Sequence, residues 1–334
     1  SRKSMLVGKR GLMKKLVEVI NLIKHFPVQK GLFKRTVGLV KAVDDVSLEI
    51  YEGETLGLVG ESGCGKSTLG KLLVRLIDPT SGSIIFDEKN LDSFSNKELR
   101  RQRQYFQMIF QDPNSSLDPR STVGKSIEEG LIIHGIKDNQ ERQKRIKEML
   151  NLVGISANAI ERFPHEFSGG QRQRIGIARA LILKPKLVVC DEPVSALDVS
   201  VQAQVLNLLN ELKNELSLTL LFISHNLSVV ENISDRIAIM YLGQIIEMLD
   251  TSKFALDCEH PYSKALLSAI PIPDPNVKKK RVILKGDVPS PINPPSGCRF
   301  HTRCPQAISK CERTEPLLLE LSQHHKASCH LLSD

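Results

Sequence analysis

Two glycine-rich stretches, each placed at the start of a helix, constrain the fold of this chain more than any other feature. The first spans residues 60–67 (GESGCGKS), and the second spans residues 168–171 (SGGQ). Glycines leave backbone N–H groups uncovered at a helix N-terminus, where the unpaired donors and the helix dipole favour a phosphate. The sequence therefore predicts two phosphate-binding helix ends, of which the second is free to close over a nucleotide held by a partner.

The first stretch matches G-x-x-x-x-G-K-[ST], with a predicted strand at 55–59 before it and a predicted helix at 67–76 after it. In such a loop the backbone holds the α- and β-phosphates, Lys66 reaches the β- and γ-phosphates, and Ser67 ligates Mg²⁺. A plain glycine turn is the alternative. The expected nucleotide contacts are Gly60, Glu61, Ser62, Gly63, Cys64, Gly65, Lys66, Ser67 and Thr68.

Two acidic residues, Asp191 and Glu192, end a second apolar strand at 187–191. The end of a buried strand can hold a carboxylate beside a metal, so Asp191 is the predicted Mg²⁺ partner. Glu192 is predicted to polarise the attacking water, because neighbouring carboxylates in different environments can divide metal and base roles. An isolated Asp-Glu pair would more often be an exposed strand end, but the upstream loop favours catalysis.

The order of the motifs resembles the ATP-binding cassette (ABC) family from about Val17 to about Leu249. The resemblance implies that Gln111 senses the attacking water and joins Ser67 and Asp191 at Mg²⁺, and that His225 contacts the γ-phosphate. It also implies that Asp198, in Ser195-Ala-Leu-Asp198, communicates across a dimer interface. The signature residues facing the partner's nucleotide are Ser168, Gly169, Gly170 and Gln171.

The adenine requires a flat apolar surface, which the family usually takes from an aromatic residue at the end of the first strand. Phe26 is the expected stacking residue, and Phe33 is its rival.

The expected fold class is α/β: a P-loop NTPase of the ABC type, with a RecA-like core, an antiparallel β subdomain and a helical subdomain. Alternating apolar residues at 16–26 and 37–50 predict an antiparallel strand pair, and helical periodicity runs from 122 to about 166. Strand and helix alternation after 187 predicts a mainly parallel sheet. The expected parts are a basic tail (1–15), a nucleotide-binding domain (16–250, helical subdomain about 113–167) and a Cys-rich C-terminal extension (251–334).

Four of the seven cysteines, Cys298, Cys304, Cys311 and Cys329, lie in the extension with the spacing C-x5-C-x6-C-x17-C. A reducing compartment argues against disulfides and leaves metal ligation as the main explanation. The spacing does not match zinc knuckles, and four thiolates are the ligand set of a 4Fe–4S cluster. Zinc and unligated thiols are the alternatives. Nearby histidines could replace one cysteine: His301, His324, His325 and His330.

Residues 289–305 also resemble the C-terminal region of oligopeptide and dipeptide importer ATPases. This implies an ATPase subunit that powers peptide import, docked on two membrane permeases and paired with a second, different ATPase subunit. A separate extracytoplasmic protein would supply the peptide. Import of nickel or another solute, or a non-transport role in DNA repair or translation, is the alternative.

Charge and hydropathy limit the binding partners and the cellular location that we expect for this chain. The net charge is +8, and part of it lies in the tail at Arg2, Lys3, Lys9 and Arg10, which fits a solvated end or contact with acidic lipid or an acidic partner. No nucleic acid is expected, because aromatic residues make up 4% of the chain and no nucleic-acid-binding motif occurs. The longest apolar stretch is too short to span a bilayer, so a peripheral position at the cytoplasmic face of the membrane is expected.

Overall fold

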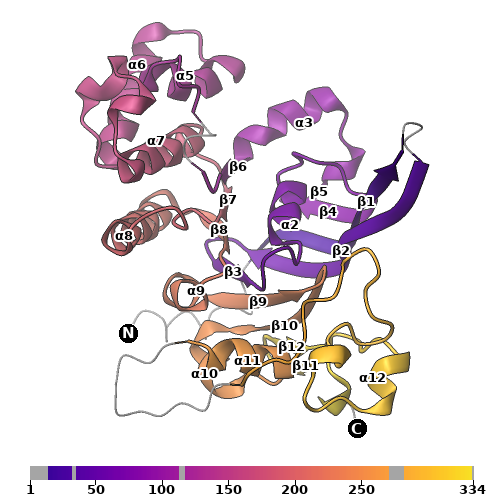
Figure 1. The fold of residues 1–334 in the computed structure, drawn as a ribbon. Helices are drawn as coiled ribbons and strands as arrows, with labels where there is room; N and C mark the ends of the chain where they lie inside the picture. The colour runs from indigo at the N-terminus through magenta and orange to yellow at the C-terminus, as the bar shows by residue number, and fades with distance from the viewer. Residues whose placement is uncertain (1–13, 32–34, 113–116, 271–281, 333–334) are drawn as a thin grey trace, which may run out of the picture. The chain divides into compact units, whose positions relative to one another are not determined.

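The computed structural model describes residues 14–31, 35–112, 117–270 and 282–332, which form two compact units (Figure 1). The first unit contains residues 1–51, 55–92 and 224–334, and the second contains 52–54 and 93–223. The expected extension therefore shares a unit with the phosphate loop. Among the described residues, no helix combines the length and apolarity needed to cross a membrane.

A four-stranded antiparallel sheet in the first unit contains the predicted strand pair. Strands β1 (Lys15–Lys30) and β2 (Arg35–Tyr51) pair antiparallel, and β4 (Ser81–Phe86) and β5 (Lys89–Asn90) extend the sheet in the order β2-β1-β4-β5. The alternation predicted from the sequence places Val17 and Val19 in the core. Of the basic tail, Lys14 and Lys15 are described, and they pair with Asp87 and with two glutamates of the sheet.

The other strands of the first unit follow the order β3-β9-β10-β12-β11. Strand β3 (Thr55–Val59) runs parallel to β9 (Arg236–Tyr241). The predicted strand at 236–240 is thus parallel as expected, whereas β10 (Gln244–Asp250), β12 (His325–Ala327) and β11 (Leu319–Ser322), to which the sequence analysis assigned no strand, are antiparallel. Leu242 and Gly243 both have positive φ (41° and 85°), and this tight turn reverses the chain where a parallel return would need a long crossover.

Short helices complete the first unit. Tyr262, Phe254 and Val230, one from each of three of them, are buried in its core. The helices are α2 (Lys66–Leu73), α9 (Leu227–Ile233), α10 (Thr251–Asp257), α11 (Pro261–Ser268) and α12 (Ser309–Arg313). Figure 1 shows α12 with β11 and β12 at the C-terminal end of the chain, so the extension is built onto the antiparallel edge of this sheet.

The second unit contains three parallel strands in the order β6-β7-β8, as strand and helix alternation predicts: β6 (Phe106–Ile109), β7 (Leu187–Asp191) and β8 (Thr219–Ile223). Its helices are α3 (Asn96–Gln102), α5 (Val123–Ile133), α6 (Asn139–Leu152), α7 (Gly169–Leu181) and α8 (Val199–Leu216). Helices α5, α6 and α7 contact one another and form the predicted helical lobe, whose expected start at 113–116 lies outside the described residues. The sequence assigned no element to α3, although Ser95 and Glu98 form a capping box at its start.

Candidate nucleotide-binding and catalytic site

The phosphate loop turns between β3 and α2 at positions that only glycine can occupy. Gly60 and Gly65 have φ of 154° and 108°. A Cβ on Gly60 would lie 2.2 Å from the carbonyl oxygen of Met240, and one on Gly65 would lie 1.9 Å from that of Ala42. Any side chain at these positions would therefore displace backbone, so both must be glycine.

Lys66 is the first residue of α2, and its side chain folds back over the loop. Its Nζ donates to the carbonyl oxygens of Gly60 (2.8 Å) and Glu61 (3.0 Å), and the residue is buried. An ammonium group has three donors, so an entering phosphate can exchange for these carbonyls. Burial raises the pKa of the neighbouring Cys64 thiol, which keeps that side chain uncharged beside the phosphate position.

Glu61 differs from the sequence expectation, which counted it only as a nucleotide contact. Its carboxylate pairs with Arg303, and its backbone N–H donates to the hydroxyl of Tyr262 at 3.0 Å. Sequence reasoning missed both partners, because they lie far along the chain and belong to no motif. The only available signal was that Arg303 lies in the segment 289–305, which resembles peptide-importer ATPases.

Phe26 lies on β1 opposite Val40 of β2, close in the chain to Ala42, whose carbonyl contacts Gly65. Its ring is 37% exposed, and Lys24 Nζ lies 5.0 Å from the ring centre. Phe26 is therefore a partly exposed aromatic residue on the strand that pairs with β2, and its role in stacking remains a prediction. The rival Phe33 lies outside the described residues.

The second unit brings Gln111 and Glu192 together. Gln111 Nε2 donates to Glu192 Oε2 at 3.0 Å, and Asp191 is buried at the end of β7. Glu192 has φ of 46°, a conformation that costs a non-glycine residue energy and occurs often at functional sites. The backbone carbonyl of Glu192 accepts a hydrogen bond from Ser195 Oγ at 3.1 Å. This strained turn presents one carboxylate next to an amide, as a water-positioning group requires.

Residues 168–171 form a capping box at the start of α7. Ser168 Oγ accepts from the Gln171 N–H, and Gln171 Oε1 accepts from the Ser168 N–H. Ser168 and Gly169 are exposed, and a Cβ on Gly170 would lie 2.4 Å from Val201. The start of α7 is therefore capped and accessible. Asp198 is the N-cap residue of α8 and is also exposed.

His225 lies two residues after the end of β8, belongs to the first unit and is exposed. Asn226, the next residue, accepts from the Ser228 N–H and starts α9. The predicted residues therefore divide between the units. Phe26, the phosphate loop and His225 belong to the first, and Gln111, residues 168–171, Asp191, Glu192 and Asp198 belong to the second.

The four C-terminal cysteines are free, and their segments meet in the first unit. The Cys298 N–H donates to the Cys311 carbonyl at 2.8 Å, and the absent Cβ of Gly297 leaves room for that carbonyl. Burial raises the pKa of Cys298 to about 11 and also raises the pKa values of Cys304 and Cys329. Among the described residues, no group of three His, Cys, Asp or Glu side chains is arranged to hold a metal ion.

The histidines suggested as substitute ligands are mostly bonded elsewhere. His325 Nε2 lies 2.8 Å from Glu247 Oε1, His330 Nε2 lies 2.7 Å from the Thr314 carbonyl, and His301 Nδ1 lies 2.9 Å from the Cys298 carbonyl. His324 Nε2 is buried without a hydrogen-bond partner. These contacts hold the extension together and do not form a ligand set.

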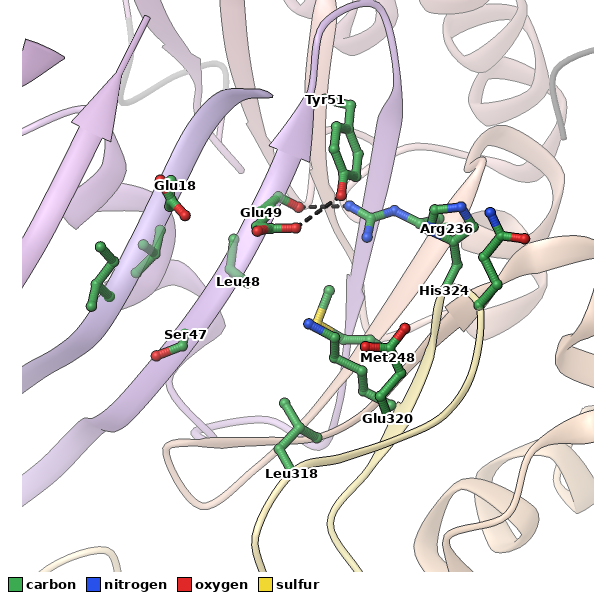
Figure 2. A pocket seen from close by; sticks show the side chains of 14 residues that line it. Glu18, Ser47, Leu48, Glu49, Tyr51, Arg236, Met248, Leu318, Glu320 and His324 are labelled. Atoms are coloured by element: carbon green, nitrogen blue, oxygen red, sulfur yellow. Dashed lines mark hydrogen bonds between the residues drawn. The ribbon is translucent and has the colours of Figure 1, made fainter. Parts of the chain in front are cut away.

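A pocket of about 590 Å³ opens elsewhere in the first unit, between β1 and β2 on one side and β10 to β12 on the other (Figure 2). Tyr51 donates to Glu49, and Arg236 donates to the Glu49 carbonyl while its guanidinium lies 4.8 Å from the Tyr51 ring centre. Glu18 and Glu320 also line it. Its lining contains none of the residues predicted to contact the nucleotide, so this pocket is not a candidate for the nucleotide site.

Comparisons with known proteins agree with a fold of the ABC type. A family described as ABC transporter matches residues 43–195, and one described as oligopeptide/dipeptide transporter, C-terminal region, matches residues 246–311. The oligopeptide transport ATP-binding protein AppF of Bacillus subtilis (strain 168) is 50% identical, over 95% of this chain and 98% of its own. A putative peptide import ATP-binding protein of Brucella ovis is 52% identical, over 94% and 97%. The dimeric ATP-binding cassette MJ0796, solved with ADP and Pi, matches with a TM-score of 0.62 and 29% identity, over 70% of this chain and 98% of that one.

Proposed function

We propose that this chain, which belongs to the family of ABC transporter ATP-binding proteins with an oligopeptide/dipeptide transporter C-terminal region, powers the import of dipeptides or oligopeptides. Proteins of this family are ATPases, and this chain is an ATPase subunit. The observation that carries the peptide assignment is the match of the C-terminal region, together with 50% identity along 98% of AppF. The proposed division remains a tail at 1–15, a nucleotide-binding domain at 16–250 and an extension at 251–334.

ATP and Mg²⁺ are the ligands that the family implies, and the phosphate loop fits them. Backbone carbonyls occupy the space that a Cβ would fill at Gly60 and Gly65, so the turn that begins α2 keeps the glycines of a phosphate-binding loop. In the proposed reaction Lys66 transfers its hydrogen bonds from loop carbonyls to the β- and γ-phosphates. The proposed Mg²⁺ ligands are Ser67, Gln111 and Asp191, and the ion, when bound, neutralises charge that develops on the phosphates.

Glu192 is the proposed base that orients the attacking water, and its hydrogen bond to Gln111 supports this role by fixing the carboxylate. His225 is the proposed contact to the γ-phosphate. Residues 168–171 would close over the ATP of a second ATPase subunit, supported by the exposure of Ser168 and Gly169 at the end of a 13-residue helix. Asp198 would signal that closure.

The family implies docking on membrane permeases and pairing of ATPase domains. We propose that two permeases hold this chain at the cytoplasmic face of the membrane, and that its partner is a different ATPase subunit. A separate extracytoplasmic protein would deliver the peptide. ATP would then bring the two ATPase subunits together, and hydrolysis would separate them.

The test is reconstitution of the chain with its co-purified permeases in proteoliposomes. We expect labelled di- or oligopeptide uptake that needs ATP and the peptide-delivering protein, and no uptake with a Lys66→Ala subunit. Uptake of nickel without uptake of peptide would replace the substrate assignment. If affinity-tagged chain purified from membranes brings no permease with it, a non-transport ATPase is the better interpretation.

For the extension we propose a 4Fe–4S cluster held by Cys298, Cys304, Cys311 and Cys329, with a zinc ion as the alternative. The support is that the four thiols, of which three are buried, are free cysteines of one short segment of the chain. Ligands of a four-iron cluster bind different iron atoms, so they stand farther apart than ligands of one ion. Because Cys298, Cys304 and Cys329 carry raised pKa values, metal binding would release protons.

Anaerobically purified chain should be brown and contain about four iron atoms per chain, as four-cysteine ligation of this cluster requires. Cys→Ser changes at the four positions should bleach it and expose residues after about 285 to protease, because a shared centre cross-links these loops. Colourless protein with one zinc would move the assignment to zinc. Metal-free protein with a protease-resistant extension would contradict both.

A further inference from the structure

Arg303, in the C-terminal extension, reaches into the phosphate loop. Its Nη1 donates to Glu61 Oε2 at 2.7 Å and its Nη2 donates to Glu61 Oε1 at 3.1 Å, across 242 residues of sequence. The Arg303 side chain is 8% exposed, and Nη1 also lies 3.4 Å from the Tyr241 hydroxyl. This is a two-pronged, charge-assisted contact of the kind that fixes both orientation and charge.

An aromatic cluster holds Arg303 and Glu61 in place. The rings of Tyr241, Tyr262 and Phe300 are buried, with centroids 4.8 to 5.4 Å apart. Tyr262 accepts the Glu61 N–H, and Phe300 lies three residues before Arg303. Tyr262 therefore holds the backbone of Glu61, and Arg303 holds its side chain. Both residues follow β9 in the chain.

The C-terminal extension also bonds to strand β2, which pairs with the strand that contains Phe26. Arg299 donates to the carboxylate of Asp44 and to the Leu242 carbonyl. Asp44 Oδ1 lies 2.7 Å from His25 Nε2, and His25 directly precedes Phe26. Two arginines of one short segment thus bond to the loop that would hold the phosphates and to the strands that would hold the adenine.

The charge of Glu61 gives the Arg303 contact a direct consequence for a nucleotide. Glu61 is the second residue of the phosphate loop, so an unpaired carboxylate there would repel the phosphates of ATP. Arg303 neutralises that carboxylate at hydrogen-bond distance. Since the repulsion scales with ligand charge, the benefit should be largest for ATP, smaller for ADP and absent for adenosine.

We propose that Arg303 is a positioning residue for the ATP site of its own chain, which neutralises Glu61 and holds the phosphate loop in its binding shape. The proposal rests on the proposed function in one respect, namely that this loop binds ATP. It makes the C-terminal extension a working part of the nucleotide site, in addition to any role in holding a metal or contacting a permease.

The test measures equilibrium binding of ATP, ADP and adenosine to the full chain. Arg303→Ala should weaken ATP binding about tenfold, ADP binding less and adenosine binding by less than about twofold, as loss of a charge-assisted pair predicts. Arg303→Lys should fall between wild type and Arg303→Ala, because it keeps the charge and loses the fork. Arg313→Ala, an exposed arginine of the same extension, is the matched control and should change nothing.

The decisive variant combines Arg303→Ala with Glu61→Gln, which removes the charge that Arg303 would balance. We expect ATP affinity to return to within about threefold of wild type, and this outcome also shows that the chain is folded. Equal weakening for ATP and adenosine, or no recovery in the double variant, would overturn the proposal. If Lys66→Ala leaves ATP binding intact, the loop is not the ATP site, and the proposed function fails independently of Arg303.

Discussion

Lowering the pH should destabilise the first unit through one buried histidine, His260. His260 is 1% exposed and is the N-cap residue of α11, where its Nδ1 accepts the Tyr262 N–H at 3.1 Å. Burial lowers the pKa of His260 from 6.5 to about 3, with a smaller contribution from Lys264. A protonated Nδ1 cannot accept a hydrogen bond, so protonation would also remove the helix cap.

The sign follows from the lowered pKa. The unfolded chain binds the proton more readily than the folded chain, so the stabilising contribution is complete above the unfolded pKa and is lost as the pH falls below it. For a pKa shift from 6.5 to about 3, the loss in unfolding free energy is about 2 kcal/mol at pH ~5 and close to zero at pH ~7.5.

The measurement is urea unfolding followed by tyrosine fluorescence, which reports mainly on the first unit because three of the four tyrosines, Tyr51, Tyr241 and Tyr262, lie there. The comparison is between wild type and His260→Asn, because Asn can cap the helix but cannot titrate. Between pH ~7.5 and pH ~5, wild type should lose about 2 kcal/mol of unfolding free energy relative to His260→Asn. The exposed His165→Asn is the control. A pH-independent difference for His260→Asn would refute the argument.

Two further predictions address the catalytic assignments. Glu192→Gln should keep ATP binding, slow hydrolysis at least about a hundredfold and trap an ATP-bound dimer, because the water loses its positioning carboxylate; near-normal turnover would remove Glu192 from that role. Lys66→Ala should weaken nucleotide binding within its own subunit, since it deletes a charge-assisted phosphate contact. Ser168→Arg should leave that binding largely intact in the isolated monomer and block ATP-dependent pairing; equal loss of nucleotide in both monomers would contradict a site shared between subunits.

Local sequence determined the features whose causes are local. The phosphate loop needs glycine at 60 and 65 because neighbouring carbonyls occupy the Cβ positions, and the spacing of its motif made it recognisable. The capping box at Ser168 and Gln171 involves residues three apart, and the alternation in β1 and β2 follows the two-residue period of a strand. These signals depend on short-range geometry, so a single sequence contains them.

The tertiary structure decided the contacts that join distant segments. The antiparallel pairing of β12 with β10 could not be predicted, because a strand of only three residues shows almost no hydrophobic periodicity. Arg303 and Glu61 meet because buried aromatic packing brings their backbones together, and nothing in either local segment encodes the other. Charge pairs at long separation are specified by the whole packed core, so the link between extension and phosphate loop appears only once the chain is folded.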